Sequence, residues 1–440
     1  MSLRLPFGLC LWRCPLIELE WIDTFFASIR RYISVRPEDQ SLILIPNQVY
    51  RLNQSGLELL MRLERGEGIE TITRDLGAEA KRDVYYFFCD LRALVRGCVR
   101  DGEKRRAIEY IPYQRPFTRL PVLSELALTY RCNLNCRFCY VDPEDTLELR
   151  TDQLKILIGK IAHEARVPSL SFTGGEPTLR EDLIELVAYA KSLNLWVNLI
   201  TNGTRLSPDL LSRLKAAGLD SIQISIEASD PKIHDYLTRR SGSFDQTLTG
   251  ISNALKAGIK VHTNTTINRI NQRSLLELPR LLKGLGLDRF SMNLMIPIGR
   301  GRKEPNLWLG YHEIRPLIER IKEIATRIGI EFIWYSPTPY CQFNPIQHGL
   351  GNKACAACEG LLSVSPRGEI LPCSSWPRPV GNLLRENFHK IWWSKEAEKI
   401  RSWLHPSCYE CEHKEICRGG CPLFWEVIGC ELYPSSPDRL

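Results

Sequence analysis

The pattern of apolar and polar residues divides the chain into three main parts. Between residues 124 and 335, short apolar runs alternate with stretches of helical periodicity, which is typical of parallel βα units. The expected strands cover 124–130, 169–172, 195–200, 220–226, 259–266 and 289–296. Six such units favour an α/β fold built on an open, partial (β/α)6 barrel of the TIM type rather than a closed eight-unit barrel.

Residues 31–98 predict a smaller, winged-helix-like α+β domain. Two apolar strands, 42–45 and 49–52, are joined by a short turn that contains proline. Asn53 is placed to cap a helix from about residue 54 to 63. A second helix follows, and a third is expected over residues 81–95. Because DNA-binding winged helices share this order of elements, a DNA-binding role is an alternative for this domain.

The remaining segments lack a strong period. Residues 1–30 are expected to be an N-terminal extension, and 99–123 a linker, because charged residues and prolines concentrate there. Residues 336–432 are rich in cysteine, glycine and proline, so bound metal is expected to replace an apolar core. Residues 433–440 form a short tail.

Composition and charge restrict the function. Hydrophobic residues make up 44% and charged residues 25% of the 440 positions, as in globular proteins in water. The net charge of +7 is mild, and arginines such as Arg300, Arg302 and Arg315 are dispersed, so nucleic acid is not an expected partner. No apolar run reaches the roughly 18–20 residues of a membrane span. Acidic residues soon follow the apolar stretch 5–12, which disfavours a signal peptide, and a cytoplasmic location is expected.

The 16 cysteines are clustered, with three between residues 132 and 139 and eight between 355 and 430. Cys132, Cys136 and Cys139 form a C-x3-C-x2-C triplet. A cubane iron–sulfur cluster normally has four thiolate ligands, so three would leave one iron open to a small molecule, as in catalytic metal sites. A zinc site or buried structural thiols are the alternatives. Packed or free thiols are expected at Cys10, Cys14, Cys89 and Cys98.

A Gly-Gly-Glu-Pro segment, Gly174 to Pro177, follows the second expected strand. Two adjacent glycines allow a sharp turn and a close approach of the backbone to a ligand. Together with the cysteine triplet, this segment resembles the signature of the radical S-adenosylmethionine (SAM) enzymes. The resemblance implies that a [4Fe–4S] cluster binds SAM and cleaves it to a 5′-deoxyadenosyl radical, which abstracts hydrogen from a substrate.

The same resemblance implies further contacts with SAM at the ends of successive strands. Phe138 would contact adenine, and the Gly-Gly-Glu-Pro segment would contact the amino group. Segment 201–203 follows the third expected strand, and segment 225–227 ends the fourth and would make the ribose or carboxylate contact. Arg240 is an alternative to Arg239 for the SAM carboxylate. The implied cofactor-binding residues are Phe138, Gly174, Gly175, Glu176, Asn202, Ser225 and Arg239.

The C-terminal cysteines resemble the seven-cysteine SPASM extension of radical SAM enzymes at every spacing. The matching positions are Cys358, Gly368, Cys373, Cys408, Cys411, Cys417, Cys421 and Cys430. By this resemblance, a first auxiliary cluster would take Cys355, Cys358, Cys373 and Cys421, and a second would take Cys408, Cys411, Cys417 and Cys430. Cys341 is an alternative to Cys355. Three [4Fe–4S] clusters would result, although two zinc sites would also suit some of these spacings.

The N-terminal domain resembles the peptide-recognition (PqqD-like) domain of pyrroloquinoline-quinone biosynthesis. The residues that match are Arg36-Pro37, Val49 to Asn53, Gly56 and Leu59-Leu60. Such a domain adds the leader of a ribosomal peptide as a strand at its exposed sheet edge, against its last helix. Backbone hydrogen bonds then supply affinity and side-chain pockets supply specificity.

One departure from the family is informative. Sulfatase-maturing relatives carry an aspartate, proposed as a base, directly after the cysteine that matches Cys373, whereas this chain has Ser374. Formylglycine formation is therefore disfavoured, and a conventional base is absent from that position.

The sequence as a whole resembles the radical SAM/SPASM peptide maturases. The resemblance implies hydrogen abstraction from a leader-bound precursor peptide, with a thioether or carbon–carbon crosslink preferred over epimerisation or decarboxylation. An electron donor such as flavodoxin or ferredoxin is implied, and neither nucleic acid nor membrane is an expected partner. The alternatives are a radical SAM/SPASM enzyme for a non-peptide small molecule and a non-catalytic metal-cluster regulator with a DNA-binding end.

Overall fold

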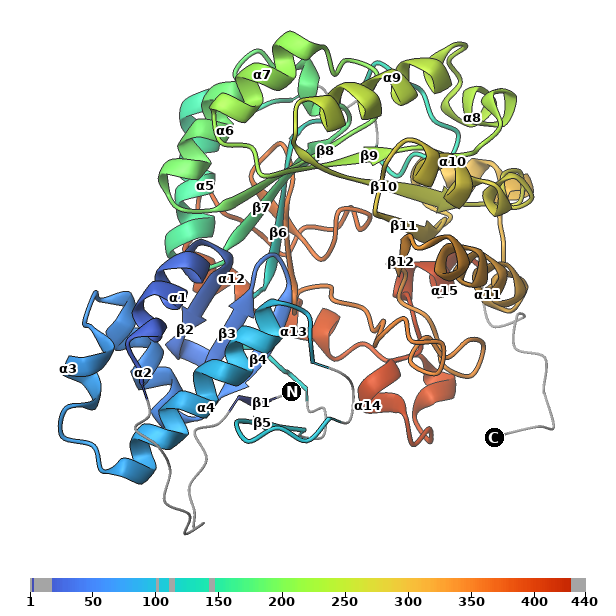
Figure 1. Ribbon diagram of the computed structural model, residues 1–440. Coiled ribbons are helices and arrows are strands. Elements are labelled where there is room, and N and C mark those ends of the chain that lie inside the picture. The colour runs from blue at the N-terminus through green and yellow to red at the C-terminus, as the bar shows by residue number, and fades with distance from the viewer. Residues whose placement is uncertain (1, 4–17, 100–102, 111–114, 142–146, 429–440) are drawn as a thin grey trace. The chain divides into compact units, whose positions relative to one another are not determined.

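The computed structural model divides into two compact units, residues 1–123 with 166–169 and residues 124–165 with 170–440 (Figure 1). The residues that it describes are 2–3, 18–99, 103–110, 115–141 and 147–428. Cys10, Cys14, Cys430 and the expected tail 433–440 lie outside this described part. Within it, no helix combines the length and the apolar character needed to cross a membrane.

The first unit is built on a small sheet with the strand order β2-β3-β4-β1-β5. Its strands are β1 (Ser2–Leu3), β2 (Ile33–Arg36), β3 (Ser41–Leu44), β4 (Gln48–Leu52) and β5 (Ile108–Glu109). Strands β2, β3 and β4 are antiparallel neighbours, whereas β1 pairs in parallel with Arg51 and Leu52 of β4. The two apolar strands expected from the sequence are therefore present, and β1 lies at the outer edge of β4.

Four helices accompany this sheet: α1 (Trp21–Ile29), α2 (Gln54–Glu64), α3 (Ile69–Thr73) and α4 (Ala78–Val95). Asn53 caps α2 as expected, because its side-chain oxygen accepts a hydrogen bond of 2.9 Å from the Gly56 N–H. Helix α1 buries Ile22, Phe26 and Ile29 in the core of this unit.

Segments expected to be an extension and a linker thus contribute to the first unit. Besides α1, Ala107 and Ile108 lie in its core. The buried Arg36 donates to both carboxylate oxygens of Asp39, at 2.9 and 2.7 Å, and to the carbonyls of Leu120 and Pro121. These hydrogen bonds hold the segment before residue 123 against the end of β2.

The second unit is built on a ten-stranded sheet with the order β12-β11-β10-β9-β8-β7-β6-β13-β14-β15. Its first seven strands are β6 (Leu123–Thr129), β7 (Ser169–Gly174), β8 (Trp196–Thr201), β9 (Ser221–Ser225), β10 (Lys260–Ile267), β11 (Arg289–Leu294) and β12 (Glu331–Trp334). Strand β6 is parallel to β7, and the strands from β8 to β12 are parallel neighbours. All six expected strands are present within a few residues, and β12 adds a seventh.

Helices connect these strands and follow the outer side of the curved sheet (Figure 1). They are α5 (Thr151–His163), α6 (Leu183–Ser192), α7 (Pro208–Ala216), α8 (Pro231–Thr238), α9 (Ser243–Lys256), α10 (Leu278–Gly284) and α11 (Tyr311–Ile328). The sequence sets where α7 and α8 begin, since Ser207 and Asp230 cap them and a proline occupies the first turn of each.

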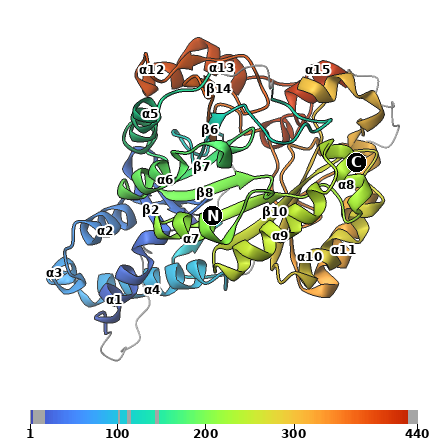
Figure 2. The same cartoon turned by 90° about the horizontal axis from the view of Figure 1, so that it is seen from above.

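The barrel is open because β6 neighbours β13 rather than β12. Strands β13 (Leu361–Val364), β14 (Glu369–Leu371) and β15 (Gly381–Asn382) continue the sheet in antiparallel pairs. The C-terminal helices are α12 (Phe388–Trp392), α13 (Lys395–Arg401), α14 (Lys414–Cys417) and α15 (Pro422–Ile428). In Figure 2, α12, α13 and α15 lie across the sheet from α7, α9 and α10. The predicted α/β fold with an open barrel and a cysteine-rich end is confirmed.

Candidate active site

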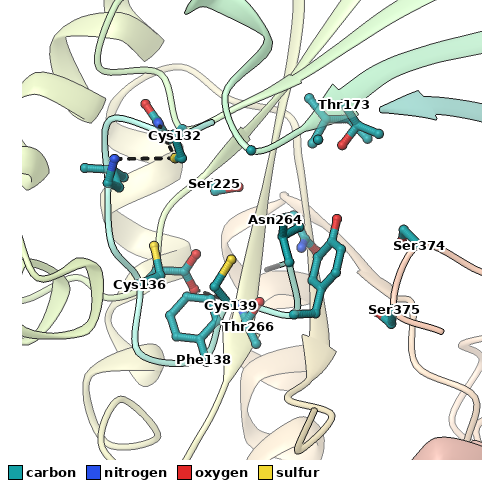
Figure 3. Close-up of a pocket in the computed structure, with 18 of the residues that line it drawn as sticks. Cys132, Cys136, Phe138, Cys139, Thr173, Ser225, Asn264, Thr266, Ser374 and Ser375 are labelled. Atoms are coloured by element: carbon teal, nitrogen blue, oxygen red, sulfur yellow. Dashed lines mark hydrogen bonds between the residues drawn. The ribbon is translucent and has the colours of Figure 1, made fainter. Parts of the chain in front are cut away.

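A cavity of about 330 Å³ lies at the carboxyl ends of the parallel strands. Its lining comes from the loop after β6, from the ends of β7 to β11 and from the loop after β14. Figure 3 shows Cys132, Cys136 and Cys139 on the first of these loops and Ser374 and Ser375 on the last. The structure therefore gathers segments from both the barrel and the cysteine-rich end around one space, where barrel enzymes carry their active sites.

The three cysteines of the triplet all line this cavity. Burial raises the pKa of the Cys132 thiol to about 11, and the charges of Glu176 and Cys139 add to the rise. Burial also raises the pKa of Cys136, where Cys139 again contributes. Because burial and the repulsion between neighbouring charges oppose thiolates at Cys132 and Cys136, a cationic iron cluster would offset both costs. The donor set fits a cluster with three protein ligands.

Both glycines of the Gly-Gly-Glu-Pro turn are required by their backbone contacts. Gly174 has a φ of +128°, and a Cβ on it would lie 2.1 Å from the Thr129 carbonyl oxygen. A Cβ on Gly175 would lie 2.3 Å from the Arg131 oxygen. The Gly175 N–H donates to Thr129 at 2.7 Å. The turn therefore packs backbone to backbone against the start of the cysteine loop.

Glu176 occupies a different position from these glycines. Its side chain is fully buried and accepts hydrogen bonds from Thr178 Oγ1 at 2.6 Å, Thr201 Oγ1 at 2.7 Å and the Asn202 N–H at 2.8 Å. Among the described residues, Gly174 and Gly175 line the cavity and Glu176 does not. The carboxylate thus ties the ends of β7 and β8 together and orients the loop after β8.

The other residues expected to contact a cofactor divide into two groups. The cavity is lined by Phe138, Asn202 and Ser225. Arg239 instead forms an ion pair of 2.6 Å with Glu304, and Arg240 donates to a backbone carbonyl at 3.0 Å. In the described part of the chain, neither arginine is part of the cavity wall.

Arg300, in contrast to Arg239 and Arg240, lines the cavity. It lies in a short 3₁₀ helix, Gly299–Lys303, where its N–H donates to the Cys139 carbonyl at 2.9 Å. Its guanidinium bonds to Asn135, and its charge opposes the rise in the pKa of Cys136. The sequence placed this residue among dispersed surface arginines, because only tertiary structure brings it to the cysteine loop.

Two carboxylates also line the cavity: Glu227, which belongs to the expected segment 225–227, and Glu125, which lies in none of the sequence motifs. Burial raises the pKa of Glu227 to about 8, although a hydrogen bond of 3.0 Å from the Thr266 N–H acts to lower this pKa. Burial raises the pKa of Glu125 as well. The sequence feature that could have identified these two residues is a carboxylate inside or directly after an expected strand.

The C-terminal cysteines form two groups. Burial raises the pKa of Cys421 to about 12, and the neighbouring Cys355 adds to the rise. Cys355 also contributes to the raised pKa of Cys358 and to that of Cys373. These four residues are the set expected to hold the first auxiliary cluster, and the structure brings them together.

The second group contains Cys417. Burial raises the pKa of this thiol, and the neighbouring Cys341 and Cys411 add to the rise. Cys408 is buried, and its sulfur lies beside Gly419. Cys341 therefore lies with this second group rather than replacing Cys355 in the first. Cys430, the remaining expected ligand, is outside the described residues.

In the described residues, no three His, Cys, Asp or Glu side chains lie where they could hold one metal ion. A cubane makes a different demand, because each of its thiolates binds a different iron.

Two family models match the chain. One, for the radical SAM superfamily, matches residues 126–282, and the other, for the SPASM iron-sulfur cluster-binding domain, matches residues 355–421. The chain is 35% identical over 344 residues to the Fe-coproporphyrin III synthase of Methanosarcina barkeri, covering 70% of this chain and 85% of the relative. It is 30% identical over 324 residues to the PqqA peptide cyclase of Rhizobium meliloti, covering 69% and 82%.

A solved structure extends the likeness to most of the chain. The crystal structure of Streptococcus suis SuiB bound to its precursor peptide SuiA matches with a TM-score of 0.69 and 19% identity. The match covers 89% of this chain and 95% of SuiB. At this identity the comparison establishes a common fold.

Proposed function

We propose that this chain, which belongs to the radical SAM superfamily and carries a SPASM iron–sulfur domain, modifies a ribosomally made precursor peptide. The observation that carries the proposal is the cavity in which Cys132, Cys136 and Cys139 meet the Gly174-Gly175 turn. Because the chain belongs to an enzyme superfamily, the alternative of a non-catalytic regulator is set aside. Relatives named as peptide maturases support a peptide substrate.

The residues around the cavity have separate roles in this proposal. The three cysteines would hold one [4Fe–4S] cluster, and Phe138, Gly174, Gly175, Asn202 and Ser225 would contact SAM. Arg300 lines the cavity and joins Arg239 as a candidate partner for the SAM carboxylate. When bound, this cluster and SAM supply a 5′-deoxyadenosyl radical that removes hydrogen from the substrate. Glu176 supports the wall by fixing the loop that carries Asn202.

The cysteine-rich end would hold two further [4Fe–4S] clusters. Cys355, Cys358, Cys373 and Cys421 form the proposed first set. The proposed second set is Cys408, Cys411, Cys417 and Cys430, with Cys341 in the same group. Because ligands from distant positions cross between the sets, the clusters would also stabilise a segment with few regular elements. A flavodoxin or ferredoxin is the proposed electron donor.

The first unit would bind the leader of the precursor by adding it as a strand. Strand β4 is the proposed edge, although β1 already pairs there with Arg51 and Leu52. A leader strand would therefore extend along Gln48 to Tyr50 or displace this two-residue pairing. The proposed product is a peptide with a thioether or carbon–carbon crosslink.

An iron porphyrin is a second candidate substrate. The observation that favours it is the 35% identity to a relative named as Fe-coproporphyrin III synthase. The strand-edge unit at the N-terminus favours the peptide instead.

Mass spectrometry of a candidate precursor decides between these substrates. The reconstituted enzyme, SAM and dithionite are incubated with a peptide encoded beside the gene, with the same peptide lacking its leader, or with Fe-coproporphyrin III. The proposal expects a loss of two hydrogens in the full peptide and a much slower change without the leader. Conversion of the porphyrin together with an unchanged peptide would overturn it.

A further inference from the structure

The cavity has a wall that the motifs do not explain, formed by Glu125, Ser374 and Tyr140. Glu125 lies in β6, directly after the buried Ser124. Its Oε1 accepts hydrogen bonds from Ser363 Oγ at 2.6 Å and from the Ser374 N–H at 3.2 Å. The cysteine-rich end thus contacts this carboxylate from strand β13 and from the loop after β14.

The side chains of Ser374 and Tyr140 line the cavity together with Glu125. A hydroxyl group can donate one hydrogen bond while it accepts another. The same cavity wall therefore carries a carboxylate and two hydroxyl groups with exchangeable protons.

The hydrogen-bond donors to the Glu125 carboxylate are neutral hydroxyl and amide groups, so that this carboxylate is available to accept a proton. In the described residues, no arginine or lysine forms an ion pair with it, unlike Glu304, which Arg137 and Arg239 neutralise. An ion-paired carboxylate is a weak base, since the positive partner stabilises its charged form. The surroundings of Glu125 do not impose that restriction.

We propose that Glu125 is the proton acceptor of the reaction, taking a proton from the substrate directly or through Ser374. This inference rests on the proposed function, in which a substrate C–H carbon becomes joined to the sulfur of an S–H group or to the carbon of a second C–H group. One hydrogen atom leaves the carbon for the 5′-deoxyadenosyl radical. The other group releases its proton to Glu125, and the remaining electron leaves to a one-electron acceptor of the iron–sulfur class. Two hydrogens are lost and one bond forms, so the step balances.

The proposal explains how Ser374 can follow Cys373. Where sulfatase-maturing relatives have an aspartate at that place, this chain has a serine whose backbone N–H donates to a carboxylate from β6 at 3.2 Å. The base is thereby supplied by the barrel rather than by the cysteine-rich end.

Glu125→Gln tests the proposal, because the amide keeps the shape and can still accept from Ser363 and Ser374 through its oxygen. Product and 5′-deoxyadenosine are measured separately, together with iron content and the visible spectrum of the clusters. The expected result is a fall in crosslinked peptide of about 100-fold, the range for loss of a general base. Deuterium transfer from labelled peptide to 5′-deoxyadenosine, iron content and spectrum are expected to stay near wild type.

Two further variants keep the test decisive if Glu125→Gln folds poorly. Glu125→Asp retains a carboxylate and is expected to restore part of the product, whereas Ser374→Ala removes the hydroxyl beside Glu125 in the cavity wall and is expected to lower product with hydrogen abstraction retained. Product formation by Glu125→Gln at the wild-type rate would overturn the proposal. So would a parallel loss of hydrogen abstraction and product, which indicates a role in holding SAM. A wild-type enzyme that leaves every peptide unchanged would overturn the proposed function and this inference with it.

Discussion

Replacing Gly250 by alanine tests how helix α9 positions the loop after β8. A Cβ on Gly250 would lie 2.1 Å from the carbonyl oxygen of Gly203. About one turn earlier, Thr247 Oγ1 donates to the Asn202 carbonyl at 2.9 Å. The helix therefore holds this loop at two adjacent points, and Asn202 lines the cavity.

The magnitude follows from these contacts. Ordinary contact begins at 3.4 Å, so the loop and the helix must separate by more than an ångström. Overpacking of this kind costs about 1–3 kcal/mol, whereas alanine gains up to about 1 kcal/mol over glycine in a helix. Asn202 also donates to Asn133 at 2.8 Å and to Glu176 at 2.8 Å. Since a misplacement of about 1 Å can slow a reaction about 100-fold, a clear effect on the site is expected.

The assay is equilibrium binding of SAM to the reconstituted protein, with Gly159→Ala as the matched control. Gly159 lies inside helix α5, and a Cβ at this position would have the Tyr189 hydroxyl as its nearest neighbour, at an ordinary contact distance of 3.7 Å. Gly250→Ala is expected to weaken SAM binding at least about tenfold, or about 1.4 kcal/mol, while the control binds as wild type. Equal SAM affinity and thermal stability in both variants would refute the close packing described.

Three other predictions concern buried groups. Glu176→Gln leaves a buried N–H facing an amide donor and is expected to lower the free energy of unfolding by about 1–3 kcal/mol; unchanged thermal denaturation would contradict it. Asp39→Asn removes the carboxylate paired with the buried Arg36, which costs about 3–5 kcal/mol, and faster hydrogen exchange in β2 and β3 is the measurement. Cys373→Ala is expected to lower iron content by up to about four atoms per chain, with Cys89→Ala unchanged; equal iron in both would exclude the first cluster.

Much of the fold was predictable because its signals are local. Each of the strands β6 to β11 carries apolar or β-branched residues and is followed by a helical stretch, so local sequence patterns located them. Strand β12, Glu331–Trp334, was missed because four residues are too short to show a period. Helix α1 was also missed, although its buried Ile22, Phe26 and Ile29 follow the spacing of one helix face.

The site divides in the same way between local and long-range features. The cysteine triplet and the Gly174-Gly175 turn are contiguous motifs, so the sequence was sufficient to predict that they share one site. Arg300 and Glu125 could not be found in this way, because their contacts with Asn135 and Ser374 span 165 and 249 positions. Only the register of the strands and the return of the C-terminal segment to β6 place these charges in the wall.

The most direct test of the account is the formation of 5′-deoxyadenosine by the reconstituted protein with SAM and dithionite. The account predicts 5′-deoxyadenosine well above background for the wild type and none for Cys136→Ala, since that variant lacks one of the three ligands. A wild-type protein with its full iron content that forms no 5′-deoxyadenosine, or a Cys136→Ala variant that forms as much as wild type, would contradict it.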